Sequence, residues 1–233
     1  MYTLLLRLAG PMQSWGTSSK FDIRGTGPEP SKSAIVGLLA AALGRKRGDS
    51  IHDLTCLRVG VRTDREGELE RDFQIARPDT PGNKSYVTIR YYLADAVFLA
   101  GVESPDAAFL EQLERALRNP VFHLYLGRKS YPVTLPLVIG IRNKGLEDAL
   151  RQEPRLAGSG NMRIVVDAVE DYDTITRDCP LSFGPDRRRY GNRFTKESVL
   201  EVRGQVGRVH DAFAELGGDR APEGCDHDAF MEL

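Results

Sequence analysis

The chain begins with the pattern of a buried strand, a polar loop and a helix. Apolar residues dominate positions 4–9 and stop at Gly10-Pro11, and a second apolar run covers positions 34–43. Ser31 or Ser33 is suited to cap a helix over 34–43, and Gly44 is suited to end it in a left-handed turn. The unpaired amides at the start of such a helix favour an anion. The pattern therefore predicts a helix whose first turn attracts a negative charge.

Further strands and helices follow with clear boundaries. Residues 57–61 and the long run 87–100 have the composition and alternation of strands. The polar stretch between them holds a turn cluster and predicts a projecting hairpin or loop over residues 71–90. Ser104-Pro105-Asp106 predicts a helix start with proline in the first helical position, and Pro120 follows its end. Two more strands, over 121–126 and 133–141, are predicted on either side of a basic turn at 127–130.

The order of these elements predicts the fold class. Strand, helix, strand, excursion, strand, helix, strand is the order of an α+β, RRM-like (ferredoxin-like) domain with an insertion between its middle strands. We place this domain at residues 1–142, with the protruding β-hairpin, or thumb, at about 71–90. A short helix, a strand over 162–169 and a short strand over 199–202 predict a smaller, mainly-β C-terminal subdomain. That subdomain covers residues 143–233 and ends in an acidic tail.

Composition narrows the protein class. The 233 residues are 41% hydrophobic and 28% charged, which is ordinary for a soluble globular protein. No apolar run approaches the roughly 20 residues that span a bilayer, and the first residues do not have the pattern of a signal peptide. Three scattered cysteines without a CxxC pair indicate neither a disulfide framework nor a zinc site. We expect a cytoplasmic protein with no membrane contact, no metal and no cofactor.

Charge is segregated along the chain although the net charge is only −1. The segments 20–47 and 187–189 are rich in Lys and Arg, whereas the last two dozen residues are acidic. The nearly neutral net charge therefore conceals basic loops, some of which surround the predicted start of the helix. A phosphate-bearing polymer is the ligand class that this combination favours.

Several candidate motifs have competing interpretations. Lys32-Ser33 matches the end of a P-loop, but Thr26 and Ser31 stand at its two glycine positions, so nucleotide hydrolysis is not expected. Trp15 either plugs the core, which its large ring favours, or offers a stacking face. Tyr91 and Tyr92 point to opposite faces of a strand, so one of them faces solvent or a ligand. That tyrosine either stacks on a base or is an ordinary half-buried residue of the sheet. No catalytic motif is present, yet metal-independent RNA cleavage needs only Tyr, Lys or His side chains.

Four segments of the chain resemble the Cas-five family of subunits of the type I-E CRISPR surveillance complex Cascade. They are residues 6–16, residues 30–33 with the glycines and leucines that follow in the helix, residues 88–96 and residues 125–130. The resemblance is specific in the N-terminal block and weak in the C-terminal part. It implies an RRM-like domain whose thumb hooks the 5′ handle of the CRISPR RNA, abuts the backbone subunit CasC and lies on a body that seats the large subunit CasA.

The resemblance also bears on catalysis. Type I-E members are non-catalytic, whereas type I-C members cut precursor RNA with a tyrosine beside a lysine and a histidine, and no lysine in this chain is followed by histidine. We expect a non-catalytic subunit, without catalytic residues, that caps the 5′ handle of the guide RNA in an antiviral Cascade complex. The alternative is a metal-independent endoribonuclease that processes precursor CRISPR RNA. The residues expected to contact RNA are Gln13, Trp15, Lys20, Arg24, Ser31, Lys32, Ser33, Arg45, Arg47, Arg90, Tyr91, Arg128 and Lys129.

Overall fold

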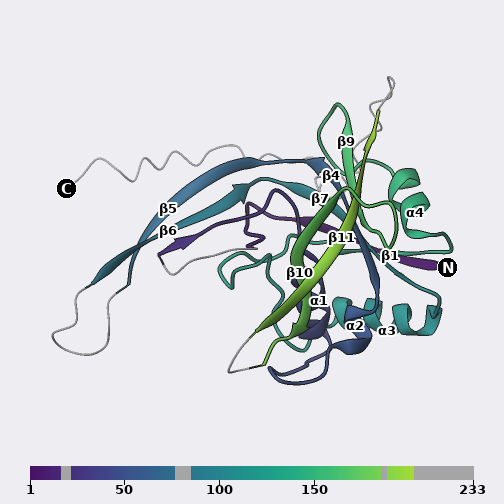
Figure 1. The fold of residues 1–233 in the computed structure, drawn as a ribbon, viewed down its shortest axis with the longest axis horizontal. Helices are drawn as coiled ribbons and strands as arrows, with labels where there is room; N and C mark the ends of the chain where they lie inside the picture. The colour runs from purple at the N-terminus through teal and green to yellow at the C-terminus, as the bar shows by residue number, and fades with distance from the viewer. Residues whose placement is uncertain (17–21, 77–84, 185–187, 202–233) are drawn as a thin grey trace, which may run out of the picture.

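The body of the molecule is a seven-stranded antiparallel sheet, seen in a computed structural model that describes residues 1–16, 22–76, 85–184 and 188–201 (Figure 1). The strand order is β10-β11-β9-β4-β7-β1-β8. The strands of this sheet, in chain order, are β1 (Tyr2–Ala9), β4 (Arg58–Arg65), β7 (Val97–Ser104), β8 (Val138–Arg142), β9 (Met162–Asp167), β10 (Thr174–Ser182) and β11 (Arg189–Leu200). Together with its few helices, this sheet gives the α+β class that the sequence predicts.

Helices cover both faces of the sheet because β1 is apolar on both sides. Leu4, Leu6 and Leu8 belong to one cluster with α1 (Lys32–Ala42), α2 (His52–Thr55) and α3 (Ala107–Arg118). Leu5 belongs to a second cluster with α4 (Leu146–Gln152). Alternate residues of a strand face opposite sides, so a run of consecutive leucines fits a strand that is buried on both faces. This is why β1 lacks the alternation of a half-exposed strand.

The helix ends confirm one sequence prediction and correct another. Ser31 is the N-cap of α1, and Gly44 follows its end with a φ of 76°. In α3 the predicted start is wrong: the cap is Asp106, whose Oδ1 accepts from Phe109 N at 3.1 Å, so Pro105 lies outside the helix. The reason is that the Ser104 hydroxyl accepts from Asp106 N at 3.0 Å and thus fixes the turn before the helix.

A second, smaller sheet projects from the body and is called the arm here (Figure 1). Its long hairpin consists of β5 (Glu68–Ala76) and β6 (Tyr86–Ala94), and the short strands β2 (Met12–Gln13) and β3 (Ile23–Arg24) also pair with β6. The excursion predicted over residues 71–90 corresponds to this hairpin, with residues 77–84 outside the described part.

The single strand predicted over residues 87–100 is wrong, because the chain turns between the two sheets. Strand β6 ends at Ala94 and β7 begins at Val97. Between them Asp95 has a left-handed φ of 56°, and its amide donates to Pro11 O at 3.2 Å. Aspartate tolerates this conformation better than most residues. The apolar run thus hides a turn that moves the chain from the arm into the body.

The predicted strand over residues 121–126 is also wrong. Val121 N and Phe122 N donate to the carbonyls of Ala42 and Ala41, so this segment caps the C-terminus of α1 instead of joining a sheet. The next strand is correspondingly short, since β8 covers only Val138–Arg142.

Beyond β9, the sequence predicts only a short strand over residues 199–202. In the structure β11 covers Arg189–Leu200 and pairs with β9 on one side and β10 on the other. Bulges after Thr176 and Pro180 interrupt the alternation that would mark β10 in the sequence. One sheet therefore runs across the predicted domain boundary at residues 142 and 143. None of the described helices is long and apolar enough to cross a membrane.

Candidate nucleic-acid interface

Four segments that are distant in the sequence meet where the arm joins the body, a region called the arm base here. It comprises residues 13–16, 22–27, 89–92 and 126–131. Ser14 N donates to Leu126 O at 3.1 Å, and Gly27 N donates to Trp15 O at 2.8 Å. Gly127 has a φ of 89°, and a Cβ on this residue would lie 1.7 Å from Ser14 O. The close approach of these loops therefore requires glycine at position 127.

Arg128 lies at the centre of the arm base. Its guanidinium donates to Tyr131 Oη at 2.9 Å, to Tyr91 O at 2.9 Å and to Arg24 O at 3.2 Å. It also lies 5.5 Å from the centroid of the Tyr131 ring. All of these partners are neutral, so the contacts fix the position of Arg128 without cancelling its charge. An arginine held in this way keeps a positive potential at the surface.

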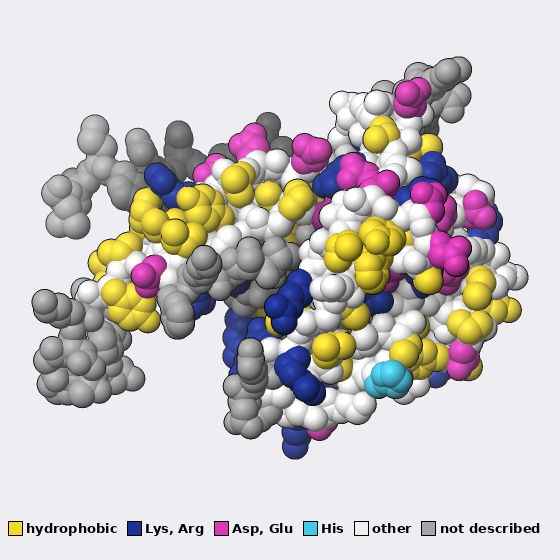
Figure 2. Space-filling model, in the orientation of Figure 1, with side chains coloured by type: hydrophobic (Ala, Val, Ile, Leu, Met, Phe, Trp, Pro, Cys, Tyr) yellow, Lys and Arg dark blue, Asp and Glu magenta, His cyan; other side chains and the backbone are white. Residues whose placement is uncertain are grey.

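Arg24, Arg90 and Lys129 add further positive charge beside Arg128. Strand β3 is parallel to β6, and Arg24 stands opposite Arg90 in their register. On the other side of β6, Asp72 of β5 stands opposite Arg90. Like charges directly opposite each other destabilise a sheet unless something neutralises them. In the described part of the chain no ion pair involves Arg24, Arg90, Arg128 or Lys129. Figure 2 shows dark-blue side chains in the hollow between arm and body, and this arrangement suits an anionic ligand.

Two of the predicted RNA contacts are buried inside the arm base. Trp15 is 2% exposed and meets Phe98 edge-on, with ring centroids 6.4 Å apart. Gln13 is fully buried, and its Nε2 donates to Ala96 O at 2.6 Å. The core interpretation of Trp15 is thus the one that the structure supports. Both side chains position the loop, and neither is exposed to a ligand in this structure.

The predicted anion site at the start of α1 exists, but an internal carboxylate fills it. Lys32 N donates to Asp178 Oδ2 at 2.8 Å, and Lys32 Nζ pairs with Asp167 Oδ2 at 2.8 Å. Arg193 binds the same two carboxylates at 2.5 and 3.2 Å, and the charge of Asp167 and Asp178 keeps the pKa of Arg193 above its ordinary value despite burial. Lys32 is only 8% exposed. The network ties α1 to β9, β10 and β11.

The two serines beside Lys32 also have internal partners. Ser31 Oγ accepts from Ala34 N at 3.3 Å and lies 3.1 Å from Ser33 Oγ. Ser31 is buried and Ser33 is half-buried. In the structure Ser31 and Ser33 therefore stabilise the start of α1. The sequence placed an anion correctly at this helix end, but it contained no signal that the anion comes from a strand more than 140 residues away.

The remaining predicted cations lie outside the arm base. Arg45 forms a bidentate ion pair with Asp53, and this hydrogen-bonded guanidinium lowers the pKa of the Asp53 carboxyl. Arg47 is exposed beyond the end of α1, and Lys20 lies outside the described residues. Of the thirteen predicted contacts, seven lie in the arm base, and Arg24, Arg90, Tyr91, Arg128 and Lys129 are those that are at least partly exposed there.

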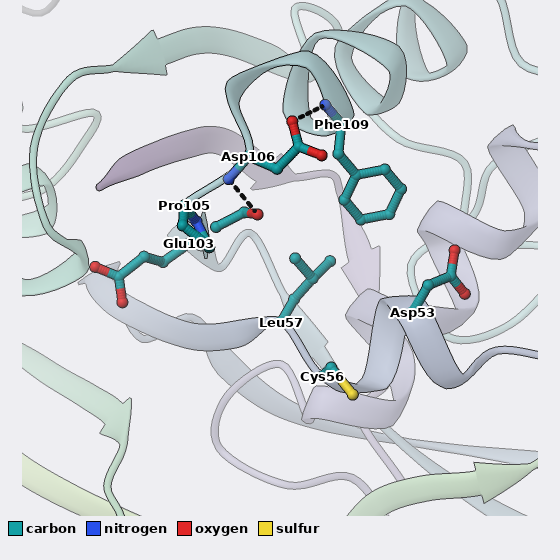
Figure 3. A pocket seen from close by; sticks show the side chains of 8 residues that line it. Asp53, Cys56, Leu57, Glu103, Pro105, Asp106 and Phe109 are labelled. Carbon is teal, nitrogen blue, oxygen red and sulfur yellow. Dashed lines mark hydrogen bonds between the residues drawn. The ribbon is translucent and has the colours of Figure 1, made fainter.

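A pocket of about 490 Å³ opens on the body beside α2 and α3 (Figure 3). Three carboxylates line it, and each already has a partner. Asp53 binds Arg45, Asp106 accepts from Phe109 N, and Glu103 accepts from Leu146 N at 3.0 Å. Cys56 and Phe109 add a thiol and an aromatic ring. Among the described residues no group of three or more His, Cys, Asp or Glu is arranged to hold a metal ion.

Comparison with known proteins gives consistent matches. A family model described as "CRISPR-associated protein (Cas_Cas5)" matches residues 3–196. Over 157 residues the chain is 40% identical to the CRISPR system Cascade subunit CasD of Escherichia coli (strain K12), which covers 59% of this chain and 70% of that protein. It is also similar to the crystal structure of a Cas protein, with a TM-score of 0.71 and 43% identity over 85% of this chain and 95% of the other. A chain from a CRISPR RNA-guided surveillance complex gives a TM-score of 0.71 and 34% identity, covering 86% of this chain and 90% of that one.

Proposed function

The chain belongs to the Cas5 family of CRISPR-associated proteins, and we propose that it is a non-catalytic subunit of a Cascade-type antiviral surveillance complex that binds the 5′ handle of the guide RNA. Its similarity to the E. coli subunit CasD and to a chain of an RNA-guided surveillance complex supports the assignment to such an assembly. The complex delegates target recognition to base pairing, so this subunit needs to hold RNA by its backbone and shape.

The observation that carries the proposal is the group of cations at the arm base, which form no ion pair in the described part and outnumber the one carboxylate opposite them, Asp72. Arg128 is fixed by two carbonyls and a phenol, and Arg24 and Arg90 stand side by side without an ion pair in the described part. A phosphate backbone would relieve this repulsion. Tyr91 follows Arg90 on β6, so its half-buried side chain lies on the opposite face of that strand from Arg90. We therefore assign the handle to the arm base, with Arg24, Arg90, Arg128 and Lys129 as phosphate contacts.

The arm is the proposed contact to a backbone subunit such as CasC, and the body is the proposed seat of a large subunit such as CasA. In the register of β5 and β6, Phe73 stands opposite Ile89 and Ile75 opposite Val87, so these side chains share one face. Phe73, Ile75 and Val87 are each more than half exposed. An apolar face of this kind is typical of a protein contact.

The RRM-like description of the core is part of the same proposal. Along the chain β1, β4, β7 and β8 are the first to fourth strands of the body, and in the sheet they lie in the order β4-β7-β1-β8. The order second, third, first, fourth with antiparallel neighbours agrees with a ferredoxin-like domain. Helices α1 and α3 pack in one cluster, as such a domain requires.

Two assays test the proposal. Purified protein incubated with labelled repeat RNA in EDTA should retain the RNA without cutting it; site-specific cleavage would support the endoribonuclease alternative. In the second assay Arg24→Glu with Lys129→Glu should weaken handle binding and reduce the slope of log affinity against log salt by about 1.4, because each lost phosphate contact removes about 0.7 for a single strand. Arg115→Glu is the matched control, since Arg115 is an exposed arginine on α3. If the salt slope of the double variant is unchanged, the handle does not bind at the arm base.

A further inference from the structure

The solvent face of the hairpin β10–β11 carries arginines and aromatic rings that the proposed function does not use. Exposure alternates along β11: Arg193 and Thr195 are buried, while Asn192, Phe194 and Lys196 are exposed. On β10, Ile175, Arg177 and Leu181 are exposed. The buried side chains join the internal network around Lys32, so the outward side chains are free to meet a partner. We call the outward residues of this face, with Tyr172 and Arg188, the hairpin strip; they are Tyr172, Ile175, Arg177, Arg188, Asn192, Phe194 and Lys196.

The strip has an apolar, aromatic middle. Ile175 stands opposite Phe194 in the register, and the Phe194 ring lies 4.8 Å from the Tyr172 ring at an angle of 58°. Phe194 is 36% exposed and Tyr172 is 46% exposed. An isolated pair of rings that contact each other on an open sheet face offers a platform on which an unpaired base can stack. In Figure 2 a yellow patch lies over β10 and β11.

One end of the strip is basic. Arg188 is exposed directly before β11, and the alternation along the strand places it on the same face as Asn192 and Phe194. Arg177 is exposed between this end and the aromatic pair, and its Nε donates to Tyr190 O at 3.3 Å. Neither of these two arginines forms an ion pair within the described residues. From Ile175 to Leu181 the strand extends for about 20 Å at about 3.3 Å per residue, which is room for a short run of nucleotides.

The opposite end of the strip is acidic, but its carboxylates are already engaged. Asp171 forms an ion pair with Lys196, and Asp173 accepts from Glu197 N at 2.8 Å. The free cations and the engaged acids therefore lie at opposite ends of one strip. This polarity gives a strand a defined placement, with its phosphates at the arginines and its bases on the rings.

From this combination we propose that the hairpin strip binds single-stranded nucleic acid, with Arg177 and Arg188 on phosphates and a base stacked on Phe194 and Tyr172. Arginine presents a planar fork that matches phosphate oxygens. A duplex hides its base faces, so exposed rings on a sheet select unpaired strands. The inference goes beyond the proposed function because the strip shares no residue with the arm base. Unpaired RNA and unpaired DNA offer the same phosphate and stacking chemistry.

Photo-crosslinking of the full chain tests this site directly. Halogenated oligo(U) and oligo(dT) serve as separate probes, and the crosslinked residues are mapped by mass spectrometry. We expect crosslinks at Phe194 or Tyr172. Crosslinks with both probes, or with one of them, support the site and identify the kind of strand it takes. Crosslinks confined to the arm base, or none at either ring, overturn the proposal.

Matched variants complete the test. Phe194→Ala should weaken binding of the probe at the strip by about tenfold, as expected for one lost stacked base. Arg177→Glu with Arg188→Glu should reduce the log–log salt slope by about 1.4, whereas Arg115→Glu should not change it. The arm-base variant Arg24→Glu should leave the crosslinks at Phe194 intact, so failure of this site and failure of the handle assignment are distinguishable. If the strip variants lose another subunit and keep the crosslinks and the slope, the face is a protein contact and the proposal is wrong.

Discussion

Replacing Lys32 by methionine tests whether this lysine is a structural residue or an RNA contact. Methionine keeps the length of the apolar stem and removes the charge. The Lys32 and Asp167 side chains are 10% and 13% exposed, and breaking a buried pair by removing one partner costs about 3–5 kcal/mol. Asp167 keeps Arg193 Nε at 2.5 Å and Val59 N at 3.0 Å. Because the carboxylate stays partly compensated, we expect the lower end, about 3 kcal/mol.

The assay is thermal unfolding of the full chain. For a protein of this size 1 kcal/mol corresponds to about 2–4 °C in Tm, so Lys32→Met should lower Tm by about 6–12 °C. Asp167→Asn and the double variant complete a cycle in which the two single losses should not add. Lys129→Met is the matched control, since Lys129 is exposed, and it should leave Tm nearly unchanged. If Lys32→Met unfolds at the wild-type temperature and instead lowers the salt slope of RNA binding, the structural role is refuted.

Three further changes probe other parts of the structure. Glu29→Gln should raise Tm at neutral pH, because burial holds the pKa of Glu29 above its ordinary value despite Arg163 nearby. A carboxyl whose pKa is higher in the folded than in the unfolded state makes the wild type more stable as pH falls, so the Tm advantage of the variant should shrink as pH falls through the folded-state pKa. A difference in Tm that does not depend on pH would contradict this cause. Gly127→Ala should cost about 3 kcal/mol or more, measured by denaturant unfolding, because its Cβ would meet Ser14 O; a wild-type midpoint would show that the loops can separate freely. Arg62→Met should cost about 3–5 kcal/mol by the same measurement, because it leaves the fully buried Asp64 without its ion-pair partner, whereas a small loss would mean that the amide of Leu156 suffices.

The sequence predicted elements well where local signals decide them. The caps of α1 at Ser31 and Gly44 are local, and so is the apolar run of β1. Prediction from the sequence failed where residues distant in the chain determine the structure. Nothing near residue 121 indicates that its amide will bond to Ala42 O, and the apolar run across Asp95 hides a turn stabilised by Pro11. Bulges in β10 break the alternation of apolar and polar residues by which a strand is recognised in a sequence, and the strand is defined instead by its pairing with β11.

The candidate site was predictable in its chemistry and only partly in its place. Excess cations near residues 20–47 and an anion at the start of α1 were readable from charge and capping. Which cations remain free depends on the location of the carboxylates after folding. Asp178 lies on β10 and Asp167 on β9, and the pairing of these strands in the sheet places both carboxylates beside Lys32. Because strand pairing brings them there, no spacing rule in the sequence could have separated Lys32 from Arg128.

The partners of each cation therefore decide what it can do. Lys32, Arg45, Arg62 and Arg193 bind carboxylates, so their charge is cancelled inside the protein and their removal should act on stability. Arg128 binds carbonyls and a hydroxyl, so its geometry is equally fixed while its charge is retained. A phosphate site needs both properties, since a mobile cation pays entropy on binding and a paired one has little attraction left. Among the predicted contacts that are described, this combination occurs at the arm base, and it explains how a chain of net charge −1 presents a positive surface for the proposed RNA ligand.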